Sequence, residues 1–153
     1  MGFLLVVLMF VGAPFVAAYT DAFNVEGQLL CEGQPFANAR LVFYEYDYSL
    51  SDICFTTTSD RNGTFRAYGY ENDGPFKHAD QLFYYVLHNC KHEQFGCSRI
   101  TIDESAWSWN SESAPVYKLE AFDLAYTLYA PCLPTVLQDL QKQYHGPECA
   151  NFI

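Results

Sequence analysis

Positive charge is scarce in this sequence. Eight Lys and Arg stand against 18 Asp and Glu in 153 residues, which gives a formal net charge of −10. The eight cations are spread singly along the chain, so the sequence offers no local basic patch. This composition excludes a nucleic-acid binder, which needs cations for phosphates, and an electrostatic membrane anchor. The acidity itself implies solubility and identifies no partner.

Long apolar runs are also missing, except at the N-terminus. Residues 1–18 contain no Asp, Glu, Lys or Arg. An apolar run from Phe3 to Val11 is followed by Gly12, Pro14 and the small residues Val16-Ala17-Ala18. This pattern predicts a secretory signal peptide cut after Ala18. The rival interpretation is a membrane-spanning helix, but Gly12 and Pro14 interrupt it. No later segment is apolar enough to cross a membrane.

Cleavage would leave 135 residues (153 − 18) that keep all six Cys. The signal peptide predicts a secreted, extracellular protein. Its six cysteines should then form disulfides, because a secreted chain folds in an oxidising compartment where thiols pair. A metal site is the alternative, since four ligand-type side chains lie within ten residues: His88, Cys90, His92 and Cys97. Disulfide chemistry is favoured in a secreted protein. No metal and no other cofactor is expected.

Short segments with alternating apolar residues extend from Phe23 to Leu128, separated by Gly, Pro, Asn and Asp. This spacing predicts an all-β, two-sheet immunoglobulin-like sandwich of about seven strands, with a small closed barrel as the alternative. Leu82–Cys90 is apolar on both faces, which predicts a central strand. The expected strands are Phe23–Cys31, Ala39–Phe43, Ile53–Thr57, Thr64–Tyr70, Leu82–Cys90, Ser98–Ile102 and one or more within Val116–Leu128.

Asn62-Gly63 lies between two of these segments and is a strong hairpin signal, because both residues tolerate positive φ. Asn62-Gly63-Thr64 is also the single Asn-x-Ser/Thr sequon, so Asn62 is the expected glycosylation site of a secreted chain.

The last 24 residues, 130–153, break the β pattern and form an extension to a sandwich domain at 19–129. Thr135 and Gln138 have the spacing of a capping box. Gly146-Pro147 supplies a stop, so we expect an amphipathic helix of about ten residues. Its apolar face packs on the sandwich or serves a partner, and packing is favoured. That face consists of Val136, Leu137, Leu140 and Tyr144.

Laid out in order, the motifs of residues 25–102 resemble the secreted transthyretin-like family of nematodes. The resemblance implies a prealbumin-type β-sandwich in an extracellular protein without an established catalytic site. The chain departs from the family pattern at Ser51-Asp52 and Ile102-Asp103, and the tail after Leu128 has no match. The motifs are Val25-Glu26-Gly27-Gln28-Leu29-Leu30-Cys31 with Gly33 and Pro35, then Leu41, Phe43, Glu45 and Asp47, then Asp52-Ile53, then Thr58-Ser59-Asp60 with Asn62-Gly63, Phe65 and Gly69, and then Val86, His88 and Cys90.

The resemblance also implies a disulfide between Cys31 and Cys90, which match the two typical cysteines of the family and end two inward-facing alternations. The other four cysteines permit more than one pairing. Cys132 with Cys149 would close the tail on itself. In the alternative, Cys54 and Cys97 each bond one tail cysteine and attach the tail to the sheet.

Hydrolases of 5-hydroxyisourate share the prealbumin-type fold, so an enzyme is a further possibility. They carry a His near the start of the fold, an Arg on the second strand and a Tyr-Arg-Gly-Ser tail. Here the first His is His78, and the chain ends Cys149-Ala150-Asn151-Phe152-Ile153. Arg40 alone makes no catalytic constellation. No nucleophile elbow, P-loop or His-Glu-x-x-His motif is present, so no catalytic residue is expected.

Aromatic residues are the remaining candidates for a binding surface. Tyr44, Tyr46 and Tyr48 alternate on one face and suit either recognition or packing under the C-terminal helix. Trp107 and Trp109 lie among Ser and Asn in a polar segment, so we expect both on an exposed partner-binding loop. The expected function is non-enzymatic binding of an extracellular protein or cell-surface component. The alternative is a carrier of a small apolar ligand. The oligomeric state stays open.

Overall fold

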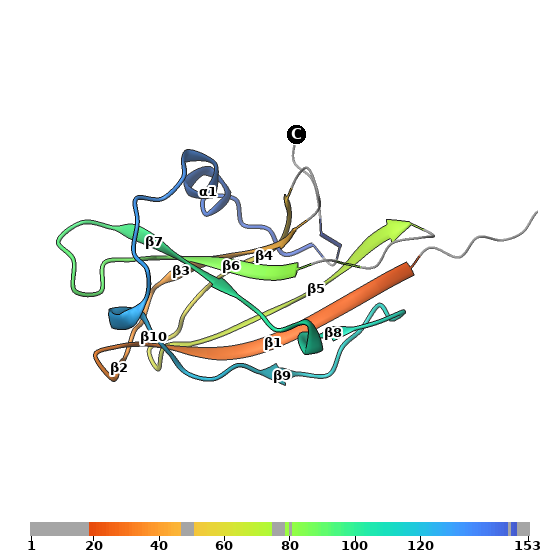
Figure 1. Ribbon diagram of the computed structural model, residues 1–153, viewed down its shortest axis with the longest axis horizontal. Coiled ribbons are helices and arrows are strands. Elements are labelled where there is room, and N and C mark those ends of the chain that lie inside the picture. The colour runs from red at the N-terminus through yellow and green to blue at the C-terminus, as the bar shows by residue number, and fades with distance from the viewer. Residues whose placement is uncertain (1–18, 47–50, 75–78, 80, 147, 150–153) are drawn as a thin grey trace, which may run out of the picture.

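The computed structural model describes residues 19–46, 51–74, 79, 81–146 and 148–149 (Figure 1). The predicted signal peptide, residues 1–18, lies outside the described residues, and the first described residue, Tyr19, belongs to the first strand. The strands are β1 (Tyr19–Cys31), β2 (Gln34–Pro35), β3 (Arg40–Tyr46), β4 (Ser51–Thr58), β5 (Thr64–Gly74), β6 (Gln81–His88), β7 (Gly96–Thr101), β8 (Trp107–Ser108), β9 (Tyr117–Lys118) and β10 (Phe122–Asp123). Two 3₁₀ helices, η1 (Glu104–Ala106) and η2 (Leu124–Tyr126), and one α-helix, α1 (Pro134–Asp139), follow β7.

The strands form two sheets, as the alternating pattern predicts. One sheet is antiparallel with the order β4-β3-β6-β7. In the other, β1 pairs with β5 and the two-residue strand β2 along one edge, and with the two-residue strands β8, β9 and β10 along its other edge. β6 lies between β3 and β7, in agreement with its two apolar faces. The all-β sandwich with a short C-terminal helix is confirmed.

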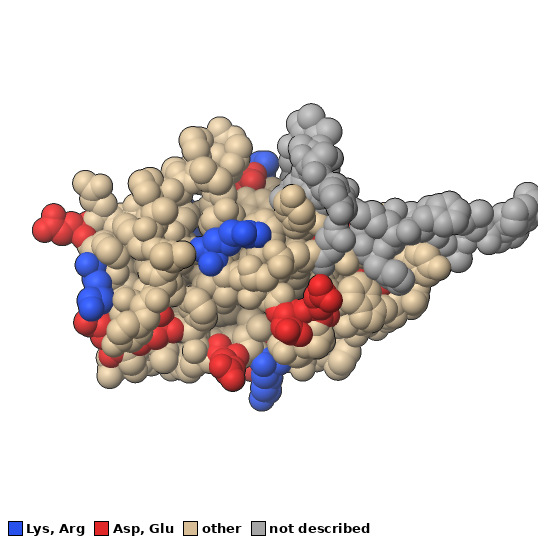
Figure 2. Space-filling model, in the orientation of Figure 1, with Lys and Arg blue, Asp and Glu red and all other residues tan. Residues whose placement is uncertain are grey.

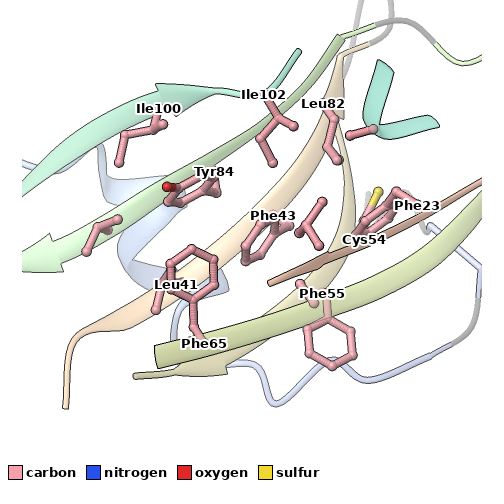
Figure 3. Close-up of a cluster of buried hydrophobic side chains, with 14 of the residues drawn as sticks. Phe23, Leu41, Phe43, Cys54, Phe55, Phe65, Leu82, Tyr84, Ile100 and Ile102 are labelled. Carbon is pink, nitrogen blue, oxygen red and sulfur yellow. The ribbon is translucent and has the colours of Figure 1, made fainter. Parts of the chain in front are cut away.

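The core lies between the two sheets and is rich in aromatic rings (Figure 3). The ring of Phe43 on β3 is fully buried, 4.8 Å from the ring of Tyr84 on β6 and 6.0 Å from that of Phe65 on β5. Phe23 on β1 stacks on Phe43 at 6.5 Å. Because aromatic side chains bury large apolar areas, this cluster is the main contact between the sheets.

Val116–Leu128 contains strands, as predicted, but it does not form one continuous strand. The segment forms β9, β10 and η2 instead. The physical reason is Asp123, whose carboxylate caps η2 by accepting the N–H of Ala125 at 3.0 Å. The same carboxylate accepts the N–H of Gly33 at 2.7 Å, so it fixes this segment against the β1–β2 turn.

The Asn62-Gly63 turn is present but does not form a hairpin. It joins β4 of one sheet to β5 of the other. Of the pair, Gly63 has a positive φ, 73°, and Asn62 is exposed. The Asp60 carboxylate accepts the N–H groups of Asn62 and Thr64 at 2.8 and 2.9 Å, which sets the turn. A local turn signal does not determine whether the flanking strands pair.

Helix α1 is shorter than expected and begins two residues earlier than the Thr135 capping box implies. Pro134 occupies its first turn, and Leu133 is the N-cap without a side-chain bond, so Thr135 does not cap the helix. Pro needs no N–H partner at that position and has the helical φ already. Val136 is buried, whereas Leu137, expected on the same apolar face, is 40% exposed.

The extension packs on the sandwich, as favoured from its sequence. Val136 and Leu140 contact the outer face of the β4-β3-β6-β7 sheet at Val42, Tyr44 and Phe83. The Tyr44 hydroxyl donates to the Asp139 carboxylate at 2.7 Å, and burial followed by this bond raises the pKa of Tyr44 well above its usual value. Tyr44 therefore serves packing under the tail. Tyr46 is 46% exposed, and Tyr48 lies outside the described residues.

Beyond α1 the chain bonds to both sheets. The N–H of Thr56 on β4 donates to the carbonyl of Tyr144 at 2.9 Å, and the N–H of Cys149 donates to the carbonyl of Tyr70 on β5 at 2.8 Å. The extension therefore bridges β4 and β5, the strands at which the two sheets would otherwise end. Edge strands expose unpaired backbone groups, and covering them protects against unwanted strand pairing.

All six cysteines are bonded. Cys31 pairs with Cys90, the bridge that the family resemblance implies, and joins the end of β1 to the chain just after β6. The other two bridges are Cys54–Cys149 and Cys97–Cys132. The structure thus adopts the arrangement that attaches the tail to the sheet through two bonds, rather than a Cys132–Cys149 bond within the tail.

Candidate functional site

Trp107 is not an exposed binding residue, so this part of the sequence prediction is wrong. Its side chain is 5% exposed, and its ring meets that of Phe23 edge-on at 5.5 Å. Strand β8 pairs with β1 and places Trp107 directly opposite Phe23, which turns the indole into the core despite its polar neighbours in sequence. The Trp107 Nε1–H is buried and has no hydrogen-bond partner among the described residues.

Trp109, by contrast, is 44% exposed. Its ring stacks on that of Trp107, with centroids 6.4 Å apart and planes 29° apart. The buried indole therefore supports the half-exposed one. A rigid aromatic side chain of this kind loses little conformational entropy when it meets a partner.

The segment that carries Trp109, which we call the 109–114 loop, is attached to β1 at three points. The N–H of Asn110 donates to the buried carboxylate of Asp21 at 2.8 Å, and the N–H of Ser111 donates to the carbonyl of Thr20. Farther along, the Asn24 amide donates to the carbonyl of Ala114 at 3.2 Å. Asp21 also accepts the N–H of Ala79 at 3.0 Å, so one carboxylate orders two connections. The loop is thus pre-organised.

A groove of about 480 Å³ lies between the 109–114 loop and the outer face of β1 and β5. We call it the β5 groove. Its volume is within the range of ligand pockets, roughly 300–1,000 Å³. The residues that line it are Phe23, Asn24, Arg66, Tyr68, Gly69, Tyr70, Glu112, Ser113 and Ala114.

The β5 groove combines tyrosine rings with one cation and one anion. Tyr68 is 50% exposed, and its ring packs 5.0 Å from that of Phe55. Arg66 donates through Nε to the Asn24 amide oxygen at 3.1 Å, while Glu112 lies on the loop side of the groove. Tyrosines beside balanced polar groups suit an amphipathic partner, because Tyr has an apolar ring and a polar hydroxyl. The alternation of Arg66, Tyr68 and Tyr70 along the predicted fourth strand was the sequence signal for this surface.

The four residues considered for a metal site are engaged in other interactions. Cys90 and Cys97 are in disulfides. The His88 ring accepts the N–H of Cys90 at Nδ1 (3.2 Å) and bonds the Ser98 hydroxyl at Nε2 (2.8 Å). The His92 ring stacks on that of Tyr129, with centroids 3.6 Å apart.

His88 and Ser98 have the spacing of a base and a nucleophile, but both are fully buried. The Ser98 hydroxyl in turn donates to the carbonyl of Leu128 at 3.0 Å. Burial, followed by the charge of His92, lowers the pKa of His88 to about 4, which keeps the ring neutral. A nucleophile must reach its substrate, so this pair holds β6, β7 and the chain near Leu128 together.

A second group of ligand-type atoms consists of Cys54, Glu71 and Cys149, which lie within 4.8 Å of one another. Both sulfurs belong to the Cys54–Cys149 disulfide. Cysteine binds a metal as the thiolate, so the two sulfurs of this disulfide offer no thiolate ligand.

Comparison with known proteins shows that the sequence matches one protein family. Residues 26–103 match the profile of the transthyretin-like family, over the same stretch that carries the ordered sequence motifs. No curated protein matches the chain significantly. Among solved structures, the chain is similar to a 9R-lipoxygenase from Cyanothece PCC8801, with 21% identity and a TM-score of 0.41 over 69% of this chain. The matched part is 17% of the length of that lipoxygenase.

Proposed function

The chain belongs to the transthyretin-like family, and from this premise we propose that it is a secreted, non-enzymatic protein that binds an extracellular protein or cell-surface component. The observation that carries the proposal is the ordered 109–114 loop, which presents half-exposed Trp109 and forms one wall of the β5 groove. Aromatic side chains on a rigid support, beside polar groups, are typical of the centres of binding interfaces.

Secretion is supported by three disulfides, which form and persist in oxidising compartments. Asn62 is exposed on its turn, where a glycan would meet no buried neighbour. Across the described residues, no helix has the length and apolar character needed to span a membrane. These features agree with an extracellular protein that carries a glycan at Asn62.

The proposal of binding rather than catalysis is supported by the burial of the His88–Ser98 pair. Arg40, which corresponds in position to the hydrolase arginine on the second strand, is exposed and pairs across the sheet with Thr58. General acid–base catalysis needs a titratable group within hydrogen-bond reach of the substrate.

The lining of the β5 groove is mostly apolar but includes charged side chains, which favours an amphipathic partner over a small, wholly apolar ligand. An apolar molecule seated there would cover the charged groups of Arg66 and Glu112 without offering them hydrogen bonds, and burying a charge without such partners is costly. Native mass spectrometry of the secreted protein checks this point, because a co-purifying apolar molecule would support the carrier instead.

The direct test is binding of the labelled, purified protein to intact cells and extracellular matrix. We expect Trp109→Ala and Tyr68→Ala each to weaken saturable binding at least about tenfold, the loss typical of a central aromatic residue. Tyr126→Ala is the matched control, because Tyr126 is 82% exposed on η2 at the other end of β1. Thermal unfolding of each variant separates lost binding from lost folding. Equal binding by all three folded variants would contradict the proposal.

A further inference from the structure

A second cavity, of about 500 Å³, lies where the C-terminal extension crosses the β3–β4 pair. Figure 1 shows α1 and the chain after it beside these strands. We call this the extension cavity. Arg40 on β3 and the run Thr56–Thr58 on β4 contribute one side, and Lys142 and His145 of the extension contribute the other.

The extension cavity gathers basic groups in an acidic protein. Two of the eight Lys and Arg and one of the four His line it, although the chain has a net charge of −10. No Asp or Glu is among its lining residues within the described chain. On the face shown in Figure 2, by contrast, Lys and Arg side chains stand apart from one another among uncharged and acidic residues.

Arg40 and Lys142 are 102 positions apart in sequence, so the fold brings them together. Arg40 pairs directly across the sheet with Thr58. The Lys142 ammonium bonds the Asp139 carboxylate at 2.7 Å, which offsets its charge in part and holds it in place. The Tyr44 hydroxyl donates to the other oxygen of Asp139, so the support of Lys142 is itself fixed.

His145 and the threonines are positioned as well. The His145 ring packs edge-on against the buried ring of Phe55, with centroids 5.0 Å apart. Thr56 bonds the backbone of Tyr144 through both its N–H and its hydroxyl. These contacts fix the extension against β4 and so fix the width of the cavity.

We propose that the extension cavity binds a small anion of the phosphate or sulfate monoester class. A guanidinium presents paired N–H donors that match tetrahedral oxyanions, and an ammonium adds a second charge. Threonine hydroxyls and the amides of Gln141 and Gln143, which also line the cavity, supply neutral donors. A single compact anion fits this set, whereas the net charge of −10 opposes the binding of a polyanion.

This site is independent of the binding function proposed above. Lys142 and His145 lie outside the family match at 26–103. The cavity is also separate from the 109–114 loop and the β5 groove, because the two share no lining residue. The inference therefore assigns a role to the extension itself.

The test is titration of the full-length, ¹⁵N-labelled protein with inorganic phosphate and with inorganic sulfate at constant ionic strength. We expect saturable shifts confined to the amides of Thr57, Thr58, Gln141 and His145. Arg40→Gln should weaken the fitted affinity at least about tenfold, since it removes the main cation. Arg61→Gln, an equal charge change on the exposed Asn62-Gly63 turn, should leave it unchanged.

Two further titrations distinguish a soluble ester from a lipid headgroup as the source of the anion. One uses glucose 6-phosphate, and the other uses phosphatidylcholine vesicles that contain phosphatidic acid. Binding to the vesicles that Arg40→Gln abolishes indicates a lipid headgroup, and binding to glucose 6-phosphate alone indicates a soluble ester. Absence of saturable binding to phosphate and sulfate, or equal loss in Arg40→Gln and Arg61→Gln, would overturn the proposal. Because both variants keep the 109–114 loop, the cell-binding result is unaffected by this outcome.

Discussion

At the scale of single residues, burial decides which polar side chains serve structure and which are available to a partner. His88, Ser98 and Asp21 are each almost fully buried, and each is hydrogen-bonded to a backbone N–H or carbonyl. Trp109 and Tyr68 are half exposed and rest on buried rings. The first group holds the sandwich and its loops in place, and the second presents a surface.

His88 makes stability depend on pH in a defined window. Its pKa is about 4 in the folded protein against 6.5 for an ordinary histidine. Between these values the unfolded chain binds a proton that the folded chain does not, so the free energy of unfolding falls as the pH drops from 6.5 to 4. The slope from this group is at most about 1.4 kcal/mol per pH unit. Above pH 6.5 and below pH 4 it contributes no slope.

Urea unfolding of the wild type and of His88→Gln across pH 3.5–7.5 measures this effect. Gln retains a donor and an acceptor but does not titrate. The difference between the two curves therefore separates the contribution of His88 to the free energy of unfolding from that of carboxylates that titrate in the same pH range. A difference that stays constant with pH would contradict the prediction.

At the scale of elements, the long strands were predictable because their alternation is local. β1, β3, β5 and β6 follow the expected segments to within a few residues at each end. The two-residue strands β8, β9 and β10 were not, since each exists through pairing with β1 across the molecule. Burial of Trp107 follows from the same long-range pairing and overrides the polarity of its neighbours.

The turns that join these elements give a matched pair of substitutions. Gly63 and Gly33 both have positive φ, 73° and 77°. A Cβ at Gly63 would lie 2.2 Å from the carbonyl oxygen of Leu29, whereas a Cβ at Gly33 would meet no atom within 4 Å. Gly33→Ala should therefore cost about 1 to 2 kcal/mol, the conformational penalty alone. Gly63→Ala should cost about 3 kcal/mol or more, because a backbone clash is added.

Chemical denaturation of both variants checks this difference. Equal losses of stability would show that the β4–β5 turn can move away from Leu29, and that its contact with β1 is weaker than the structure indicates. The carbonyl of Gly63 also accepts the N–H of Leu29 at 2.9 Å, so the same substitution should increase hydrogen exchange at Leu29.

At the scale of the whole molecule, the candidate sites differ in how far the sequence could predict them. Tyr68 and Tyr70 alternate on one strand, so their shared face was predictable. Arg40, Lys142 and His145 come from β3 and from the extension, and their meeting depends on how the tail folds back. The sequence alone left that path open, because it did not decide whether Cys149 bonds Cys132, Cys54 or Cys97.

The disulfide pattern therefore decides whether the extension cavity exists, and a non-reducing peptide map tests it. Trypsin cuts after Lys and Arg, and the cut sites place each of the six cysteines in a different peptide. We expect peptide 41–61 linked to 143–153, peptide 92–99 linked to 119–142, and the peptide ending at Arg40 linked to 78–91. A link between 119–142 and 143–153 would detach the tail from β4 and remove the cavity.

The same map tests whether the chain passes through the secretory pathway. The peptide ending at Arg40 should begin at Tyr19 if the signal peptide is cut after Ala18. Peptide 62–66 contains Asn62 and Thr64, so glycosylation should change its mass and enzymatic removal of the glycan should convert Asn62 to Asp. Linked cysteines in a peptide set that begins at Met1 and has unmodified Asn62 would contradict secretion, because the chain would then have folded and oxidised without passing through that pathway.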